Sequence, residues 1–461
     1  MSELQANTLL VERVAQDPAA RLFAIPDSFG GWFDLSAAEF DDRVRALAKG
    51  FLAAGLRHGD RVGVLCSNRF EATLVDFATA LIGVAVVPVA QGASQDEIQA
   101  VLEIAEVVAM VVETARDFAR FDELHGDLPL VSEVWQVALN GLEKLVLAGR
   151  GVSDETLAES AAAVTSETAL GDYFVPTGDG LRRVTVSHRV LAARARSLAE
   201  VLDPATGDGH STLLVLPAVD VTARLVTLIS VATGTKLGHL SDPSRLLDTL
   251  ASFRPTLLVA PPFVFETIDE AAQERAQAVG RGPALRQALD VAIDYARALD
   301  DETVPRGLKA RFALADAIVL RGLRKAAGGR LVDVVSLAGP SALSQRLRYL
   351  MRALDVRPLE AFGSTETSGI ALIERHSDPF ERETGGVGAP LAGLEVSLGA
   401  DDGLLVRGDG VAGGAGLGGA GASGAWLETG IEASLDAEGR VTLVLADIVE
   451  PLPVAADAST D

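Results

Sequence analysis

Short apolar runs alternate with segments of helical periodicity along the first third of the chain. The apolar runs are Arg61–Cys66, 83–88 and Val107–Val112, and residues 71–81 and 95–105 between them space their apolar positions as a helix does. Strands that alternate with helices of this length predict a parallel sheet covered on both faces. Residues 1–165 therefore predict a first α/β part.

A helix start is also readable before this region. Ser36 is followed three residues later by Glu39, which is the pattern of a capping box. The run that follows places Leu47, Phe51 and Leu52 on one helical face. We expect a helix that begins after Ser36 and packs this face inward.

The α/β pattern continues over 166–384 and then changes. Residues 213–216 predict a buried strand leading into a helix near Asp220, 290–323 predict helix with a break near 303–307, and 332–336 predict another strand. From 385 to 450 short alternating runs and frequent turns predict a small β-barrel-like unit, before an acidic tail at 451–461. The fold class expected is α/β, with two doubly wound parts and one small β part.

Composition narrows the classes of partner. The 461 residues carry a formal net charge of −24, which argues against nucleic acid or an anionic membrane as the main partner. The single cysteine, Cys66, excludes an internal disulfide. The apolar reach 77–90 is interrupted by Pro88 and is shorter than the ~20 residues of a membrane span. We expect a cytoplasmic protein without a membrane span.

Several familiar chemistries find no support. The six histidines are scattered without metal-ligand spacing, and no Gly-x-Ser-x-Gly nucleophile motif occurs. Gly408-x-Gly410-x-x-Gly413 matches a dinucleotide fingerprint by letter, but a Gly- and Ala-rich stretch follows it instead of a helix. Residues 408–424 therefore predict a flexible loop.

The stretch 360–369 is the best candidate for a reactive site. Its small residues let the backbone approach a ligand, and Thr365 and Thr367 offer hydroxyl groups. Glu366 offers a carboxylate that could hold a Mg²⁺-bound phosphate. Thr365 and Glu366 are the candidate catalytic residues, and Glu366 is the candidate magnesium ligand.

The order Phe362-Gly363-Ser364-Thr365-Glu366 resembles the aromatic-Gly-x-Thr-Glu motif of the adenylate-forming (AMP-binding) superfamily. Residues 253–266, which begin Phe-Arg-Pro-Thr, resemble a segment of long-chain fatty-acid–CoA ligases, and 59–62 and 68–71 fit the opening of such a ligase. The resemblance covers about residues 8–450. It implies the fold of the large N-terminal domain of an acyl-CoA synthetase and, if the chain is active, an ATP-dependent acid–thiol ligase that uses Mg²⁺, ATP and CoA.

The same resemblance implies two sets of binding residues. The nucleotide-binding positions would be Thr177, Gly178, Arg182, Gly339, Phe362, Gly363 and Ser364. The acyl-pocket positions would be Asp220, Arg224 and Phe263. For Asp220, a helix cap is the alternative role.

Residues 174–182 depart from the family's phosphate-binding loop. Pro176 lacks an N–H donor, and Asp179 adds a negative charge where a triphosphate would bind. At ~4 Å and an effective dielectric constant of ~20, two like charges repel by ~4 kcal/mol. The segment is read either as a surface turn that no longer binds ATP or as a rewired nucleotide loop that uses Arg182.

Three further family features are altered. Ile431 stands where the family has a ribose-binding aspartate, and 445–448 replace the hinge motif. The family's small mobile C-terminal domain does not follow in this sequence. Each of these changes removes or alters a feature that the family uses to bind ATP, so together they favour a chain impaired in adenylation.

Two classes of function remain open. The first is a binding or regulatory subunit for an acyl or acyl-CoA molecule, as a homodimer or paired with an intact ligase; a CoA-thioester binder without catalysis is a weaker version. The second is a working ligase or acyl-transfer enzyme in which Arg182 replaces the lysine and a partner chain supplies the missing domain. No cofactor is certain, and ATP, Mg²⁺ and CoA are expected only for the second class.

Overall fold

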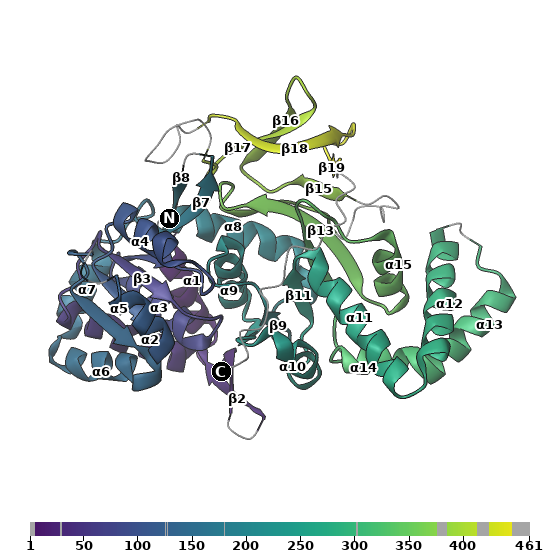
Figure 1. Cartoon of the computed structure of the whole chain (residues 1–461), viewed down its shortest axis with the longest axis horizontal. Coiled ribbons are helices and arrows are strands. Elements are labelled where there is room, and N and C mark those ends of the chain that lie inside the picture. The colour runs from purple at the N-terminus through teal and green to yellow at the C-terminus, as the bar shows by residue number, and fades with distance from the viewer. Residues whose placement is uncertain are drawn as a thin grey trace.

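The computed structural model describes residues 5–27, 30–124, 126, 128–178, 180–300, 303–375, 385–412 and 424–444. Two sheets with helices on their faces form the described chain, as Figure 1 shows. This confirms the expected α/β class.

The smaller sheet has the strand order β6-β5-β3-β4-β7-β8. Its strands are β3 (Arg61–Leu65), β4 (Ala85–Pro88), β5 (Ala109–Val112), β6 (Glu133–Gln136), β7 (Ala169–Thr177) and β8 (Gly180–Ser187). The strands β3, β4, β5 and β6 run parallel to one another, and β7 runs parallel to its neighbour β4, as the alternating pattern predicted. β8 returns antiparallel to β7. The helices of this part of the chain are α2 (Ala37–Ala53), α3 (Phe70–Leu81), α4 (Gln95–Ile104), α5 (Ala115–Asp122), α6 (Gly141–Ala148) and α7 (Asp154–Ala162).

Local sequence signals set where these helices begin. Ser36 caps α2 and accepts a hydrogen bond from the Glu39 N–H, while the Glu39 carboxylate accepts one from the Ser36 N–H at 2.9 Å. Ser94 and Glu97 form the same box at the start of α4. The predicted capping box is confirmed, and α2 buries Leu47 and Phe51 as expected.

The larger sheet has a parallel centre and antiparallel ends. The strands from β10 through β9, β11 and β12 to β13 run parallel, β1 joins them beside β10, and β14 and β15 extend the other edge antiparallel. The strands are β1 (Arg21–Pro26), β2 (Trp32–Ser36), β9 (Ser211–Leu214), β10 (Lys236–His239), β11 (Leu257–Ala260), β12 (Asp333–Ala338), β13 (Arg357–Ser364), β14 (Gly369–Ile373) and β15 (Gly386–Pro390).

Helices cover this larger sheet. They are α1 (Ala6–Gln16), α8 (His188–Val201), α9 (Val221–Thr233), α10 (Leu246–Phe253), α11 (Pro262–Ala278), α12 (Gly282–Asp300), α13 (Arg306–Ala315), α14 (Arg321–Ala326) and α15 (Gln345–Ala353). Short 3-10 turns occur at Val137–Leu139, Gly149–Gly151, Asp203–Ala205 and Pro243–Arg245. Among the described helices, none combines the length and apolar character that a membrane span requires.

The small β part lies at the top of Figure 1. It consists of β16 (Leu394–Leu398), β17 (Gly403–Gly408), β18 (Leu427–Leu435) and β19 (Val441–Leu443), paired antiparallel as the turn-rich sequence predicted. β19 also pairs with β15, so these strands continue the larger sheet. Within the predicted loop 408–424, residues 413–423 lie outside the described residues, as do the altered hinge and the tail at 445–461.

The sheets do not follow the predicted domain ranges strictly. β1 and β2 belong to the larger sheet although they lie within 1–165, and β7 and β8 belong to the smaller sheet although they lie within 166–384. The chain therefore crosses between the two parts more than once. This crossing places the β7–β8 hairpin beside the end of β13.

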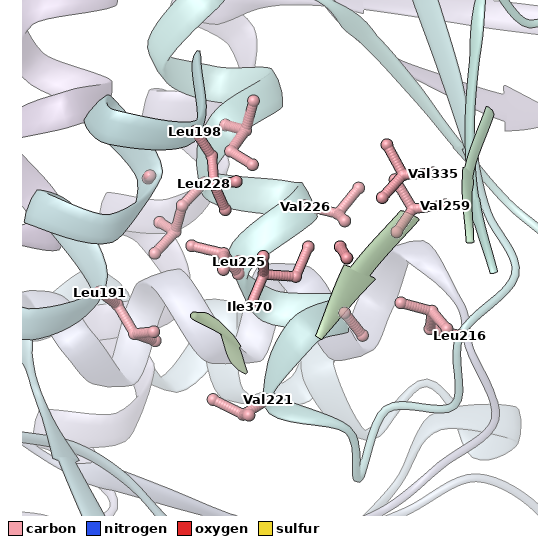
Figure 2. Close-up of a cluster of buried hydrophobic side chains, with 14 of the residues drawn as sticks. Leu191, Leu198, Leu216, Val221, Leu225, Val226, Leu228, Val259, Val335 and Ile370 are labelled. Atoms are coloured by element: carbon pink, nitrogen blue, oxygen red, sulfur yellow. The ribbon is translucent and has the colours of Figure 1, made fainter. Parts of the chain in front are cut away.

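The largest core cluster lies under the candidate site. In this cluster, leucines of α8 and α9 pack with apolar residues of the larger sheet, as Figure 2 shows. The helices contribute Leu191 and Leu198 of α8 and Leu225 and Leu228 of α9, and the sheet contributes Val259, Val335 and Ile370. Burying each such leucine contributes roughly 1.5–3 kcal/mol. The core thus packs α9 against β14, which begins at the end of the candidate stretch.

Candidate functional site

The candidate stretch 360–369 is only partly a turn. Residues 360–364 belong to β13 and Gly369 opens β14, so the turn itself is 365–368. β13 continues through the small residues to Ser364, so only the second half of the stretch is free to form a turn. A Cβ on Gly363 would lie 2.2 Å from the Gly369 carbonyl oxygen, so glycine is required where the two strands meet.

Thr367 holds this turn together. Its buried hydroxyl accepts a hydrogen bond from the Ser364 N–H at 2.8 Å and donates one to the Gly369 carbonyl at 2.7 Å. The hydroxyl that the sequence offered as a ligand contact is therefore engaged inside the turn. Thr365 faces two cavities and remains the hydroxyl open to a ligand.

The segment at 174–182 forms a tight β-hairpin. Thr177 pairs with Gly180 and Val175 with Arg182, so the strands β7 and β8 are paired as far as Thr177 and Gly180. The Thr177 hydroxyl donates to the Gly180 carbonyl at 3.0 Å. A phosphate loop instead turns successive N–H groups toward an anion. The described residues at the tip of the segment are exposed, as the surface-turn interpretation expected, but most of the segment lies within two paired strands.

An ion pair joins this hairpin to the candidate turn. Arg182 Nη2 lies 2.5 Å from Glu366 Oε1, and the two side chains are 27% and 17% exposed. Glu366 also accepts a hydrogen bond from the Ala412 N–H through its carbonyl. The cation and the carboxylate that the family resemblance assigns to phosphate and Mg²⁺ thus neutralise one another.

A first cavity, of about 260 Å³, lies at the carboxyl ends of β12 and β13. Gly339, Gly363, Ser364 and Thr365 line it together with Asp220. Five predicted residues thus meet in one place, which lies where parallel sheets usually bind ligands. Phe362 is buried in the core and does not line this cavity.

A second cavity, of about 610 Å³, lies beside the β7–β8 hairpin and shares Asp220 and Thr365 with the first. Its walls are mainly apolar and include Tyr173, Phe174 and Leu181. Among the described residues, the only charged side chains in its lining are Glu97 and Asp220. Two carboxylates and no lining cation disfavour an anionic ligand.

Asp220 caps a helix as well as lining both cavities. Its carboxylate accepts a hydrogen bond from the Thr222 N–H at 2.8 Å at the start of α9, which supports the cap alternative. Burial raises the pKa of this carboxyl, against the smaller opposing effect of that hydrogen bond. Asp220 therefore caps α9 and at the same time lines both cavities.

The other two acyl-pocket candidates lie elsewhere. Arg224 is buried, forms an ion pair with Asp76 and donates to the Leu170 carbonyl at 2.8 Å. It lines a small cavity of about 60 Å³ and neither of the two cavities beside Thr365. Phe263, on the first turn of α11, is 59% exposed and lines neither of the two larger cavities.

Sequence reasoning missed an apolar cavity of about 240 Å³ that lies against the central strands β11 and β12 of the larger sheet. Phe265 and Ile268 of α11 face it, as do Leu258 of β11 and Leu350 of α15. The signal was present in the spacing of Phe265 and Ile268 on one face of α11. Finding the opposing wall required the arrangement of the helices.

A buried charged cluster between α15 and the first half of β13 was also missed. Arg348 Nη1 lies 3.3 Å from Glu360 Oε2, and Arg348 Nη2 lies 2.9 Å from Glu374 Oε1. Glu360 also accepts a hydrogen bond from the Leu343 N–H at 2.6 Å. Burial raises the pKa of Glu360 to about 7, although Arg348 opposes the shift. No spacing in the sequence marks three charges on separate elements as neighbours.

The structure adds no direct support for a metal centre. Among the described residues, no three His, Cys, Asp or Glu side chains come together as a metal-binding group. The assignment of Mg²⁺ to Glu366 stays a prediction. Ile431, which the family resemblance aligns with the ribose-binding aspartate, lies in β18 and packs partly against the core.

Comparisons with known proteins agree with this architecture. The model of the AMP-binding enzyme family matches residues 10–421. A long-chain-fatty-acid–CoA ligase, FadD15, from Mycobacterium bovis is 31% identical over 427 residues, which cover 90% of this chain and 70% of that ligase. FadD15 from Mycobacterium tuberculosis has the same identity and coverage.

Solved structures share the fold at lower identity. The N-terminal domain of FACL13 from Mycobacterium tuberculosis superimposes with a TM-score of 0.67 at 16% identity, covering 95% of this chain and 99% of that domain. The anthranilate CoA ligase AuaEII superimposes with a TM-score of 0.71 at 15% identity, covering 96% of this chain and 77% of that one. The matched residues and the shared architecture together show that the chain belongs to the AMP-binding enzyme family.

Proposed function

We propose that this chain is an acyl-CoA synthetase homologue impaired in ATP-dependent adenylation, and that it acts as a binding or regulatory subunit. The observation that carries the proposal is the Arg182–Glu366 ion pair across the candidate site. A cytoplasmic location and pairing with itself or with an intact ligase are part of the proposal.

The ion pair opposes nucleotide binding in two ways. Mg²⁺ would have to compete with Arg182 for the Glu366 carboxylate, and a phosphate would have to compete with Glu366 for Arg182. The hairpin from 175 to 182 meanwhile pairs backbone groups that a phosphate loop would leave free. Activation of a carboxylate needs positive charge held at the transferring phosphoryl group, and this arrangement leaves that charge neutralised.

The direct test is a calorimetric titration with Mg²⁺ and ATP, together with a pyrophosphate-release assay over a panel of fatty acids. We expect neither ATP binding in the micromolar range nor turnover. FadD15 from Mycobacterium tuberculosis, treated identically, is the positive control. Micromolar ATP binding accompanied by turnover would reject the proposal.

The regulatory role needs its own test. The chain would be co-expressed with an intact ligase of the family, and the pair would be separated by size-exclusion chromatography and assayed for acyl-CoA formation. We expect a stable complex whose rate or acyl-chain preference differs from that of the ligase alone. If the two proteins elute separately and the ligase is unaffected, this part of the proposal fails.

A second candidate function is an active ligase with a rewired nucleotide site. One observation favours it: the buried Arg182 Nε has no hydrogen-bond partner among the described residues. A ligand acceptor could bind that nitrogen while a partner chain completes the site. Arg182→Ala should then abolish turnover in the co-purified complex, and an unchanged rate would reject this version.

A further inference from the structure

A basic, partly apolar surface runs along the helix that leads from α13 into α14. α13 ends at Ala315, a π-helical turn spans Asp316–Leu320, and α14 begins at Arg321. We call this feature the α13–α14 surface. Its exposed charged and large apolar residues are Arg306, Lys309, Arg311, Leu314, Ile318, Arg321 and Lys325.

The charge of this segment is opposite to that of the chain. Residues 306–325 contain six of the forty Lys and Arg residues and one acid, Asp316, in a protein of net charge −24. Asp316 is engaged by Arg321 and Arg324. An anionic partner is therefore attracted here, although the chain as a whole repels it.

The inner face of the same helix is already accounted for by folding. Phe312, Val319 and Leu323 pack against the core of the larger sheet's helices, and Phe312 stacks on Tyr295 of α12 with ring centres 4.0 Å apart. Leu314 and Ile318 point away from this core, with 62% and 72% of their surface exposed. Two large apolar side chains between exposed cations are therefore not explained by packing within the chain.

The position of the surface suits a planar partner. α12 and α13 extend beyond the body of the sheets at the right edge of Figure 1. A flat surface could therefore meet α13 before it meets most of the acidic remainder of the chain. Basic residues that flank exposed Leu and Ile on one helix are typical of a helix that lies in the interface of an anionic membrane.

We propose that the α13–α14 surface binds peripherally to the surface of an anionic lipid bilayer. The cations contact lipid phosphates, and Leu314 and Ile318 enter the boundary between headgroups and acyl chains. The net charge of −24 argues against binding to an anionic membrane through the chain as a whole, and this surface is a local exception. The proposal does not depend on whether the chain adenylates a substrate.

The test is co-sedimentation of the full chain with vesicles of phosphatidylcholine alone or of phosphatidylcholine mixed with phosphatidylglycerol. We expect binding to the anionic vesicles only, and loss of binding when salt is raised to ~1 M, where the screening length falls to ~3 Å. Equal binding to both kinds of vesicle, or no binding to either at low salt, would overturn the proposal.

Paired variants separate the two contributions. Arg311→Gln with Lys325→Gln should weaken partitioning roughly fivefold for each cation removed. Arg150→Gln with Lys144→Gln is the control, because it removes the same number of positive charges from exposed positions in the part of the chain built on the smaller sheet. It should leave partitioning nearly unchanged. Comparable losses in both pairs would assign the binding to net charge and would reject a role for this surface.

The apolar contribution is tested by Leu314→Ser with Ile318→Ser. Binding should fall while thermal unfolding stays unchanged, because both side chains are exposed. Leu139→Ser with Leu147→Ser, two exposed residues far along the chain, is the matched control. Size-exclusion chromatography with light scattering completes the test: a dimer that the Leu314 and Ile318 changes dissociate would assign the surface to a second copy and reject the membrane.

Discussion

Arg182 and Glu366 come from different sheets, yet their charged groups meet at 2.5 Å. Both side chains are partly exposed, so solvent screens the attraction and its net contribution is modest. We predict a coupling free energy of ~1 kcal/mol between Arg182→Ala and Glu366→Gln in a double-mutant cycle. Urea unfolding of the four variants measures it, and additive effects of the two changes would show that the contact contributes nothing to stability.

The sequence could identify both partners but not the pairing. Arg182 and Glu366 were each singled out by the family resemblance, because each stands at or near a position that handles phosphate or metal. Their contact follows from the β7–β8 hairpin, whose paired strands bring Arg182 to the turn that follows β13. Local patterns carry information on strand formation, whereas the distance between residues 182 and 366 depends on how the two sheets are placed.

Asp220 determines how α9 begins. Because its carboxylate accepts the Thr222 N–H, we predict that Asp220→Ala lowers the free energy of unfolding by about 1 kcal/mol. Asp220→Asn keeps an oxygen that can accept the Thr222 N–H bond. It also removes a negative charge that burial disfavours, as the raised pKa of the Asp220 carboxyl indicates. This variant should therefore be at least as stable as the parent at neutral pH. Thermal unfolding of the three proteins provides the measurement, and equal losses in both variants would contradict the capping role.

Glu360 couples β13 to α15 and to pH. The pKa of the Glu360 carboxyl is about 7 in the folded chain, whereas its ordinary value, which applies to the unfolded chain, is 4.5. Between these two pH values the folded state therefore binds more protons than the unfolded state. The free energy of unfolding should therefore fall as pH rises through this window, by up to roughly 3 kcal/mol.

Glu360→Gln removes this dependence, because the amide does not titrate and its oxygen can still accept from the Leu343 N–H. Urea unfolding at about pH 5 and about pH 8 should show the parent losing stability relative to the variant as pH rises. Glu143→Gln, on an exposed position of α6, is the charge-matched control. A parent and a Glu360→Gln variant with identical pH profiles would show that Glu360 does not titrate in this window.

At the scale of the whole molecule, regular patterns predicted the elements well. The parallel strands of the smaller sheet, the capping box at Ser36 and the antiparallel strands after 385 all arise from local periodicity and turn residues. The crossing of β1 and β2 into the larger sheet, and of β7 and β8 into the smaller one, could not be predicted in this way. Such pairings are decided by which buried faces fit together over long sequence separations.

Arg224 shows how the two sheets are held together. From α9 it reaches Asp76 on α3 and the Leu170 carbonyl on β7, both of which belong to the part of the chain built on the smaller sheet. Replacing only the arginine leaves Asp76 without its partner in a buried setting. We predict that Arg224→Met lowers the free energy of unfolding by about 3–5 kcal/mol, a cost typical of a broken buried ion pair.

The double variant Arg224→Met with Asp76→Leu distinguishes an unpaired charge from lost packing. Replacing both charges with apolar groups of similar size should recover most of the lost stability, because no carboxylate is then left buried without a cation. Urea unfolding followed by circular dichroism measures both variants. If the double variant were no more stable than Arg224→Met, the contribution of Arg224 would lie in its bond to the Leu170 carbonyl and in its packing, and the ion pair would not be what joins the sheets.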